Sequence, residues 1–187
     1  MKLVILDRDG VINQDSAQYI KSPEEWQPIP GSLDAIARLG RSGWRVVVAT
    51  NQSGLRRKFF DIGTLARIHD KMHRQLAEIG GRVDAIFICP CVDSERCSCR
   101  KPKPGMLNEI AERLSTSLDD VPYIGDKLSD LKAARAAGAR PWLVRTGNGA
   151  DVERAGKGLQ GVEIFDDLAA AVDSLINDQS SPSASGQ

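Results

Sequence analysis

The chain has 187 residues, of which 41% are hydrophobic and 27% charged, and this supplies enough apolar material for one globular domain with a substantial core. Basic and acidic residues number 25 each, so no overall positive field is available to hold nucleic acid or an anionic membrane, and neither partner is expected. The sequence contains no apolar run of about 18 residues and opens directly into a strand pattern without signal-peptide features. We expect a cytoplasmic protein that acts as a monomer.

Strand and helix patterns alternate along the first half of the chain. Residues 2–7 contain an apolar run that predicts a buried strand, and residues 32–39 carry the period of an amphipathic helix. The β-branched run 44–51 predicts a second strand, and residues 84–89 predict a third. Between these two strands, a longer helix is indicated by an apolar stripe: Leu65, Ile68, Met72, Leu76 and Ile79.

The second half continues this alternation after a cysteine-rich loop at residues 89–99. A helix is expected to begin at Pro104-Gly105. Its apolar face would be formed by Leu107, Ile110 and Leu114. Further elements are predicted at residues 121–126 (strand), 128–137 (helix), 141–144 and 162–165 (strands) and 166–176 (helix). Residues 1–177 are expected to form a single domain, followed by a polar tail, residues 178–187, that is expected to be disordered.

Strands separated by helices predict a doubly wound parallel α/β sheet, in which ligands bind beyond the carboxyl ends of the strands. Polar side chains stand at several of these predicted ends. Asp7 and Asp9 follow the first strand, Thr50-Asn51 ends the second and Asp126 ends a later one. If these strands are neighbours, carboxylates, a hydroxyl and an amide converge in one crevice, and we expect the functional site there.

The residue types at this crevice suit magnesium and phosphate. Asp7, Asp9 and Asp126 would give a hard-oxygen site of the kind that Mg²⁺ prefers, and Mg²⁺ favours phosphate as a partner. Thr50-Asn51 could donate hydrogen bonds to phosphate oxygens. Three cations stand just before a predicted helix, where they and the free N–H groups of the helix favour an anion: Arg100, Lys101 and Lys103. Together these groups are typical of phosphoryl-transfer sites.

Four short segments carry a family resemblance: Asp7-Arg8-Asp9-Gly10, Thr50-Asn51, Lys101 and the sequence GDKLSD at Gly125–Asp130. In this order they resemble the four motifs of the haloacid dehalogenase superfamily of phosphatases, which have a Rossmann-like fold. The resemblance covers residues 2–146. It implies that Asp7 attacks phosphorus and forms an aspartyl-phosphate, and that Asp9 acts first as a general acid and then as a general base.

The same resemblance implies a cofactor and the groups around it. Mg²⁺ would be held by three oxygen donors: the side chains of Asp7 and Asp126 and the backbone carbonyl of Asp9. Thr50 and Lys101 would neutralise charge on the transferring group. Asp130 would orient Lys101.

Each segment has a simpler interpretation when it is taken alone. An Asp-x-Asp-Gly sequence is often a turn with solvated acids, Thr50-Asn51 could cap a strand end, and Gly125-Asp126 could be another turn. A receiver domain also carries a phosphorylated aspartate on a doubly wound fold. There the acceptor lies on a later strand, and residues 46–49 contain no aspartate. The ordered combination therefore favours a phosphatase.

All four cysteines fall in one array, C-x-C-x5-C-x-C: Cys89, Cys91, Cys97 and Cys99. In a cytoplasmic chain this clustering favours a tetrahedral Zn²⁺ site over disulfides, with free thiols or an adventitious metal as the alternative. A nucleic-acid-binding zinc module would need a basic surface with aromatic residues, whereas this loop carries Asp93, Glu95 and no aromatic residue. We expect a structural zinc that pins the loop and holds Arg100 and Lys101 over the site.

The two histidines, His69 and His73, form an H-D-x-x-H pattern on a predicted helix, superficially like a zinc-protease motif. Asp70 replaces the usual glutamate, no third ligand is apparent, and charged residues surround the pair. We interpret both histidines as solvated.

The spacing between the motifs leaves no room for a large cap domain, so short loops would select the substrate. The zinc loop leading into Cys99-Arg100-Lys101-Pro102, together with TNQSG and GDKLSD, resembles the heptose bisphosphate phosphatases of the superfamily. Histidinol-phosphate phosphatases share the loop. The resemblance implies removal of the 7-phosphate of a heptose 1,7-bisphosphate, in the synthesis of nucleotide-activated heptose for lipopolysaccharide. Histidinol phosphate is the alternative substrate.

The resemblance also implies which residues would contact a sugar bisphosphate. They are Asp15, Tyr19, Thr50, Asn51, Gln52, Ser53, Arg100, Lys101 and Lys127. The second phosphate could be bound by Arg100 and Lys127 or by the basic run 56–58. That run has a simpler interpretation as a solvated loop.

Overall fold

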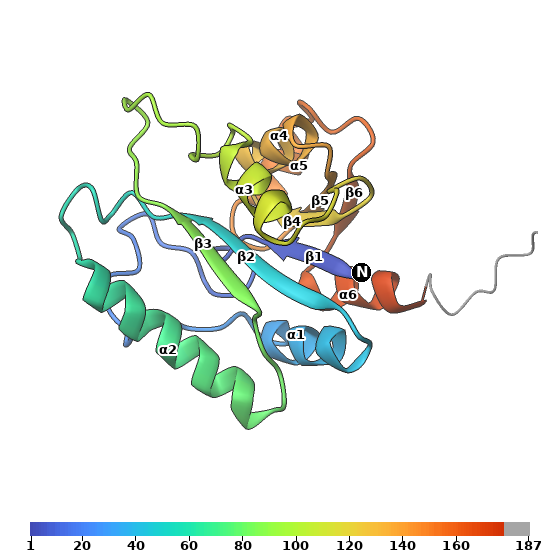
Figure 1. The fold of residues 1–187 in the computed structure, drawn as a ribbon, viewed down its shortest axis with the longest axis horizontal. Coiled ribbons are helices and arrows are strands. Elements are labelled where there is room, and N and C mark those ends of the chain that lie inside the picture. Colours follow the sequence, from blue (N-terminus) through green and yellow to red (C-terminus); the bar gives the residue numbers. More distant parts are fainter. Residues whose placement is uncertain (178–187) are drawn as a thin grey trace, which may run out of the picture.

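The computed structural model describes residues 1–177, and the tail at 178–187, predicted to be disordered, lies outside the described residues. Strands and helices alternate along the chain (Figure 1). The strands are β1 (Leu3–Leu6), β2 (Arg45–Asn51), β3 (Ala85–Cys89), β4 (Pro122–Gly125), β5 (Arg140–Val144) and β6 (Glu163–Phe165). The helices are α1 (Ser32–Arg41), α2 (Ile62–Glu78), α3 (Gly105–Arg113), α4 (Leu128–Ala136), α5 (Gly149–Ala155) and α6 (Leu168–Asn177).

The strands form one parallel sheet in the order β3-β2-β1-β4-β5-β6. β1 pairs with β2 from Leu3 to Leu6, whereas its register with β4 covers only Ile5 and Leu6. The winding direction of the chain reverses between β1 and β4, so the carboxyl ends of these strands border the crevice in which such folds bind ligands. The predicted doubly wound parallel sheet is confirmed.

Alternate residues of β1 point to opposite faces of the sheet, and each face has its own hydrophobic core. Val4 and Leu6 belong to the core beneath α1, α2 and α6, whereas Leu3 and Ile5 belong to the core beneath α3 and α4. Figure 1 shows these two groups of helices on opposite sides of the sheet. Because both faces are covered, β1 is apolar along its whole length, as its sequence predicted.

The structure departs from the sequence prediction at two helices. α5 was not predicted, because among its described residues only Gly149 is buried and the segment therefore has no apolar stripe. The predicted stripe of α2 included Ile79, but α2 ends at Glu78 and Ile79 is 44% exposed. Gly80 follows with a φ of 72°, a left-handed conformation that ends the helix.

No insertion of domain size separates the described elements, in agreement with the prediction that a large cap is absent. The two long connections are residues 7–31, between β1 and α1, and residues 90–104, between β3 and α3. Both begin at the carboxyl ends of strands, where the sequence analysis placed the site. Among residues 1–177, no helix is long and apolar enough to cross a membrane.

Candidate active site

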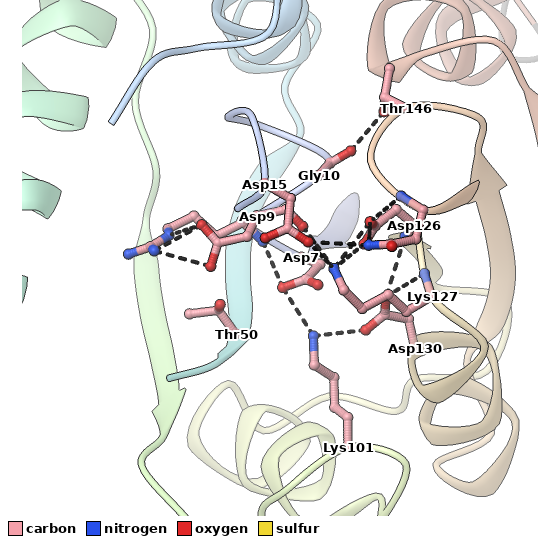
Figure 2. Close-up of polar contacts among 12 residues, drawn as sticks. Asp7, Asp9, Gly10, Asp15, Thr50, Lys101, Asp126, Lys127, Asp130 and Thr146 are labelled. Atoms are coloured by element: carbon pink, nitrogen blue, oxygen red, sulfur yellow. Dashed lines mark hydrogen bonds and ion pairs between the residues drawn. The ribbon is translucent and has the colours of Figure 1, made fainter. Parts of the chain in front are cut away.

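The strand ends converge on one polar cavity of about 390 Å³. Asp7 follows β1, Thr50 lies in β2, and Lys127 follows β4, while Lys101 reaches in from the loop before α3 (Figure 2). Asp126 contacts the Lys127 ammonium and is completely buried. The residues predicted from the sequence that line the cavity are Asp7, Asp9, Asp15, Tyr19, Thr50, Asn51, Gln52, Ser53, Arg100, Lys101, Lys127 and Asp130.

Asp7 lies on the cavity wall with a side chain that is almost fully buried. Its Oδ1 accepts hydrogen bonds from the Arg8 backbone N–H at 2.7 Å and contacts the Lys101 ammonium at 3.0 Å. Burial raises the pKa of Asp7 to about 7, against the opposing pull of the Lys101 charge. Further positive charge near this carboxylate would therefore favour its ionised form.

Lys101 is buried, and its ammonium has a complete set of partners. It contacts Asp7 at 3.0 Å and Asp130 at 2.8 Å, and it donates to the Tyr123 hydroxyl at 2.8 Å and the Ala49 carbonyl at 2.9 Å. Burial alone would lower the pKa of Lys101, but Asp130 and Asp7 outweigh it and the pKa is raised. Lys101 therefore carries its charge into the cavity, with Asp130 against it as predicted (Figure 2).

The Lys127 ammonium lies among oxygen atoms that the sequence analysis assigned to Mg²⁺. It contacts the two carboxylate oxygens of Asp126 at 2.8 and 3.0 Å and the backbone carbonyl of Asp9 at 3.3 Å. It also pairs with Asp15 at 3.1 Å. A cation among these oxygens shows that the position favours positive charge, and hard oxygen donors of this kind suit Mg²⁺.

A third carboxylate, Asp130, lies within 4.8 Å of the ligand atoms of Asp7 and Asp126. Its oxygens already accept hydrogen bonds from the backbone N–H groups of Asp126 and Lys127, and from the Tyr123 hydroxyl, besides the Lys101 contact. Asp130 is therefore committed to protein donors. The residues present fit a divalent cation held by Asp7, Asp126 and the Asp9 carbonyl.

The loop after β5, residues 145–149, was not assigned to the site from the sequence. The Thr146 hydroxyl donates to the Gly10 carbonyl at 2.7 Å (Figure 2). Asn148 donates to Asp126 Oδ2 from its backbone at 2.8 Å and from its side chain at 3.1 Å. The signal that could have found this loop is a polar Arg-Thr-Gly-Asn-Gly run directly after a buried strand, which resembles the polar ends of β1 and β2.

Asp9 is held by donors on both carboxylate oxygens. Arg8 contacts it through Nε and Nη2 at 2.8 to 3.0 Å, and Asn13 and Gln52 each donate to it at 2.9 Å. Burial alone would raise the pKa of Asp9, but the Arg8 guanidinium and these hydrogen bonds outweigh it and lower the pKa. Asp9 therefore rests as a carboxylate.

The prediction that both histidines are solvated is wrong for His69. Its ring is half-buried, and Nε2 lies 3.1 Å from Arg8 Nη1. His73, one turn further along α2, is exposed as predicted. The sequence pattern missed this contact because the partners are 61 positions apart in the chain.

Two residues that were predicted to contact the substrate form hydrogen bonds or ion pairs with other protein groups. The Asn51 amide accepts from the Lys101 backbone N–H and donates to its carbonyl, both at 3.2 Å. Arg100 pairs with Asp93 at 2.5 Å and donates to the Cys91 carbonyl at 3.1 Å. Asn51 thus fixes the Lys101 segment, and Arg100 lines the cavity while it is tied to the cysteine loop.

The basic run 56–58 lies outside the residues that line the cavity. Arg56 pairs with Glu95 of the cysteine loop at 2.7 Å. This contact joins the loop after β2 to the loop after β3. The pairing gives Arg56 a structural partner, and nothing in the described residues places the run against a substrate phosphate.

The four cysteine sulfurs lie within 4.8 Å of one another and form no disulfide. Cys89 and Cys97, and also Cys91 and Cys99, are 3.9 Å apart. A tetrahedral Zn²⁺ site with Zn–S bonds of about 2.3 Å would separate its sulfurs by about 3.8 Å. The Cys89–Cys99 pair is closer, at 2.6 Å. The four sulfurs supply the ligand set of a closed zinc site, and two of these three separations match its spacing.

Comparison with known proteins places the chain among phosphatases. A family model described as HAD-hydrolase-like matches residues 98–171. The D-glycero-β-D-manno-heptose-1,7-bisphosphate 7-phosphatase of Bordetella bronchiseptica is 56% identical over 178 residues, covering 95% of this chain and 99% of that protein. The enzyme of the same name from Pseudomonas putida is 53% identical over 176 residues, covering 94% of this chain and 100% of that protein.

Solved structures agree with this placement. A crystal structure of the D,D-heptose 1,7-bisphosphate phosphatase from B. bronchiseptica, in complex with magnesium and phosphate, aligns with a TM-score of 0.94 over 95% of this chain and 99% of that one. The corresponding enzyme from Burkholderia thailandensis aligns with a TM-score of 0.76 at 45% identity, over 94% of this chain and 99% of that one. The chain therefore belongs to the haloacid dehalogenase superfamily and, within it, to the family of the D-glycero-β-D-manno-heptose 1,7-bisphosphate 7-phosphatases.

Proposed function

We propose that residues 1–177 form a single Mg²⁺-dependent phosphatase domain that removes the 7-phosphate of D-glycero-β-D-manno-heptose 1,7-bisphosphate through an aspartyl-phosphate on Asp7. The observation that carries the proposal is the position of Asp7. Its carboxylate lies on the wall of a polar cavity, 3.0 Å from a buried ammonium and beside the ligand atoms of Asp126. A carboxylate in such surroundings can attack a bound phosphoryl group. The names of the relatives supply the substrate and its β anomer.

In the first step, an Asp7 oxygen attacks phosphorus, and the bond between phosphorus and the sugar oxygen breaks. Lys101 neutralises the phosphoryl oxygens, and the Thr50 hydroxyl donates to them. Asp9 protonates the departing oxygen. Asp9 takes up this proton from solvent as the substrate binds, because the negative charge of the bound phosphate raises the pKa of Asp9 from its lowered resting value. Bound Mg²⁺ would be held by Asp7, Asp126 and the Asp9 carbonyl, and supplies charge neutralisation at the transferring group.

In the second step, water attacks phosphorus and the bond to Asp7 breaks. Asp9, which is a carboxylate again after the first step, accepts the proton of this water. Arg8, Asn13 and Gln52 hold the carboxylate form of Asp9 in place for this role. The products are inorganic phosphate and a free Asp7 carboxylate. Asp9 returns the proton of the water to solvent when phosphate leaves, so the enzyme is ready for another substrate.

The cavity offers partners for the second phosphate of a bisphosphate. Arg100 from the cysteine loop and Lys127 at the start of α4 both line it. Each is paired with an acid, Asp93 and Asp15 respectively, and a phosphate would compete for those cations. The same two acids line the cavity and could pair with the amine of histidinol phosphate, which is the second candidate substrate.

We further propose that the four cysteines hold one structural Zn²⁺ per chain. The thiol cluster leaves no coordination position for water, so the metal would act on the loop and not on the substrate. Arg100 donates to the Cys91 carbonyl and Lys103 donates to the Cys97 carbonyl at 2.6 Å. The zinc would thereby fix the backbone that leads to Lys101. The proposed enzyme acts as a monomer on a small molecule and needs neither nucleic acid nor a membrane.

Replacement of Asp7 by Asn tests the phosphatase mechanism. The amide keeps the size of the side chain but is not a nucleophile, so release of phosphate from the heptose bisphosphate should fall by at least about 10³-fold. Phosphate release and the melting temperature are measured for this variant and for Asp151→Asn, a matched change of an exposed acid on α5. Near-normal turnover in a folded Asp7→Asn protein would disprove the covalent mechanism.

The substrate assignment is tested by comparing kcat/KM for the heptose bisphosphate and for histidinol phosphate. We expect the bisphosphate to be preferred by at least about 10²-fold, because two charge-assisted contacts to its second phosphate are absent for histidinol phosphate. The product should retain the 1-phosphate, which phosphorus NMR identifies. Equal kcat/KM values for the two substrates would reject the heptose assignment and leave the phosphatase assignment standing.

A further inference from the structure

The Arg8 guanidinium lies completely buried between Asp9 and His69. Its Nε and Nη2 edge contacts the Asp9 carboxylate, and its Nη1 lies 3.1 Å from His69 Nε2. A buried guanidinium is costly unless its donors are satisfied, and its planar fork allows one orientation for a given set of acceptors. Two acceptors on different edges therefore fix the plane of this group.

The contact fixes the tautomer of His69. Arginine donates hydrogen bonds and cannot accept them, so His69 Nε2 must be the acceptor and the ring proton must be on Nδ1. Burial, together with the adjacent Arg8 charge, lowers the pKa of His69 to about 3, in agreement with a neutral ring. A neutral acceptor adds no charge that would compete with Asp9 for the guanidinium.

We propose that His69 is a positioning residue for the general acid and base: it fixes the Arg8 guanidinium, which in turn sets the place of the Asp9 carboxylate at the cavity wall. The inference rests on the proposed function, because it concerns the step in which Asp9 protonates the leaving oxygen. Asn13 and Gln52 also contact Asp9, but each donates to a single oxygen. Arg8 contacts both carboxylate oxygens of Asp9. His69 contacts the opposite side of the guanidinium, at Nη1.

Rates measured with two different leaving groups distinguish this positioning role from a general effect of the substitution on folding. The 7-oxygen of the heptose is a primary alkoxide when it leaves, so its departure requires a proton from Asp9. The para-nitrophenolate ion is stable without a proton. A displaced Asp9 should therefore slow the first step with the sugar phosphate and leave it nearly unchanged with para-nitrophenyl phosphate. The ratio kcat/KM reports this step, because it ends with the departure of the leaving group.

Two substitutions of His69 differ in whether the new side chain can accept a hydrogen bond from Arg8. The amide oxygen of His69→Gln can reach the position of Nε2 and accept from Arg8, whereas His69→Leu fills similar space without an acceptor. His73→Ala is the matched control, one turn away on the same helix and exposed. Kinetics with both substrates and melting temperatures are measured for all three variants and the wild type.

We expect His69→Leu to lower kcat/KM for the heptose bisphosphate by about 10-fold or more, a part of the roughly 10²–10⁴-fold that general acid catalysis contributes. The loss for para-nitrophenyl phosphate should stay below about 3-fold, and His69→Gln should recover most of the sugar-phosphate rate. Equal losses with both substrates, no loss with either, or a faster His69→Leu enzyme would overturn the proposal. A wild type that hydrolyses neither substrate would instead remove the proposed function itself.

A measurement on the wild-type protein covers the case in which His69→Leu does not fold. Nitrogen NMR of the histidine rings should show His69 as the neutral Nδ1–H tautomer, with His73 as the exposed reference. The shift of Nε2 should be that of a hydrogen-bonded acceptor. Protonation of Nε2 at neutral pH would overturn the proposal, because that nitrogen could not then accept from Arg8.

Discussion

Asp7 must be ionised to act as the nucleophile, whereas its burial disfavours the ionised form. Its pKa is raised from 3.8 to about 7 in the folded protein, chiefly by burial. Because the folded pKa lies above the unfolded one, ionised Asp7 destabilises the fold, and this effect grows as the pH rises through that interval. The destabilisation is absent below pH 3.8 and complete above about pH 7.

We therefore expect Asp7→Asn to stabilise the magnesium-free protein relative to the wild type at high pH. The gain in the free energy of unfolding should be on the order of a few kcal/mol above pH 7 and should shrink as the pH falls toward 4, because Asn cannot ionise. Urea unfolding across this pH range measures it, with Asp151→Asn as the exposed control. A gain that does not change with pH would contradict the assignment of the raised pKa to Asp7.

Gly147 shows how closely the loop after β5 packs against the cation site. A Cβ at this position would lie 2.2 Å from Asp126 Oδ2 and 2.7 Å from Gly10 Cα, and the residue has a φ of 58°. Only glycine can bring the backbone this close to the carboxylate. This loop was not predicted to belong to the site, although Asn148 within it donates two hydrogen bonds to Asp126.

Gly147→Ala should weaken Mg²⁺ binding by at least about 10-fold, because the new Cβ must displace Asp126. Gly156→Ala is the matched control, since Gly156 has a similar φ of 66° but a Cβ added there would meet nothing within 4 Å. Both variants should lose about 1 kcal/mol of stability from the left-handed backbone. Calorimetric titration measures the Mg²⁺ affinity of both variants. Equal affinities would show that the close approach of Gly147 to Asp126 is unimportant for Mg²⁺ binding.

At the scale of elements, the loop between β3 and α3 has little apolar core of its own. It is tied instead by polar contacts that run back to its cysteines, such as the donation from Lys103 to the Cys97 carbonyl. The Gly105 backbone N–H, at the start of α3, donates to the Ser98 carbonyl at 3.1 Å. The position of Lys101 therefore depends on the conformation of the whole loop.

Cys97→Ser should lower the zinc content from about one per chain, the expectation for a closed Cys₄ site, and should lower kcat/KM by about 10-fold or more. The effect on activity is indirect, because Asp7 and Asp126 lie outside the loop. Elemental analysis and phosphate release measure the two effects, and Ser94→Ala, at an exposed position of the same loop, is the control. A reduced protein without zinc that keeps full activity would refute a structural zinc.

At the scale of the whole molecule, the sheet has a short pairing between β1 and β4, and this pairing is the joint between its two halves. The register between β1 and β4 covers two residue pairs, whereas β1 and β2 share four. Asp7 and Asp126 stand at the carboxyl ends of the strands that meet at this joint. A cation bound by both would add a link between the two halves of the sheet, which α1 and α6 also join by packing against each other.

Mg²⁺ should therefore stabilise the protein against heat. At a hundredfold excess over Kd the gain is about 2.7 kcal/mol, which for a chain of this size raises Tm by about 5–10 °C. The wild type is compared with Asp126→Asn in buffers with and without Mg²⁺, and no chelator is used because a chelator would also remove zinc. The shift should vanish in Asp126→Asn. An equal shift in both proteins would place the binding site elsewhere.

The sequence by itself determined the order of the strands and of every helix except α5, the parallel sheet and the acidic strand ends, because buried parallel strands are continuous apolar runs and their polar ends interrupt them abruptly. Asp7, Thr50 and Asp126 could be placed at one crevice from this pattern alone. The cysteine spacing likewise indicated a cluster, and the four sulfurs lie together.

Only the tertiary structure decided which polar groups contact each other across the chain. The contact between Arg8 and His69 joins residues 61 positions apart, and the bond between Thr146 and Gly10 joins residues 136 apart. Periodicity reports which face of an element is buried, and it carries no information on how far one element is rotated or shifted against another. The direction of a polar side chain depends on that placement, so its partner appears only once the helices are packed on the sheet.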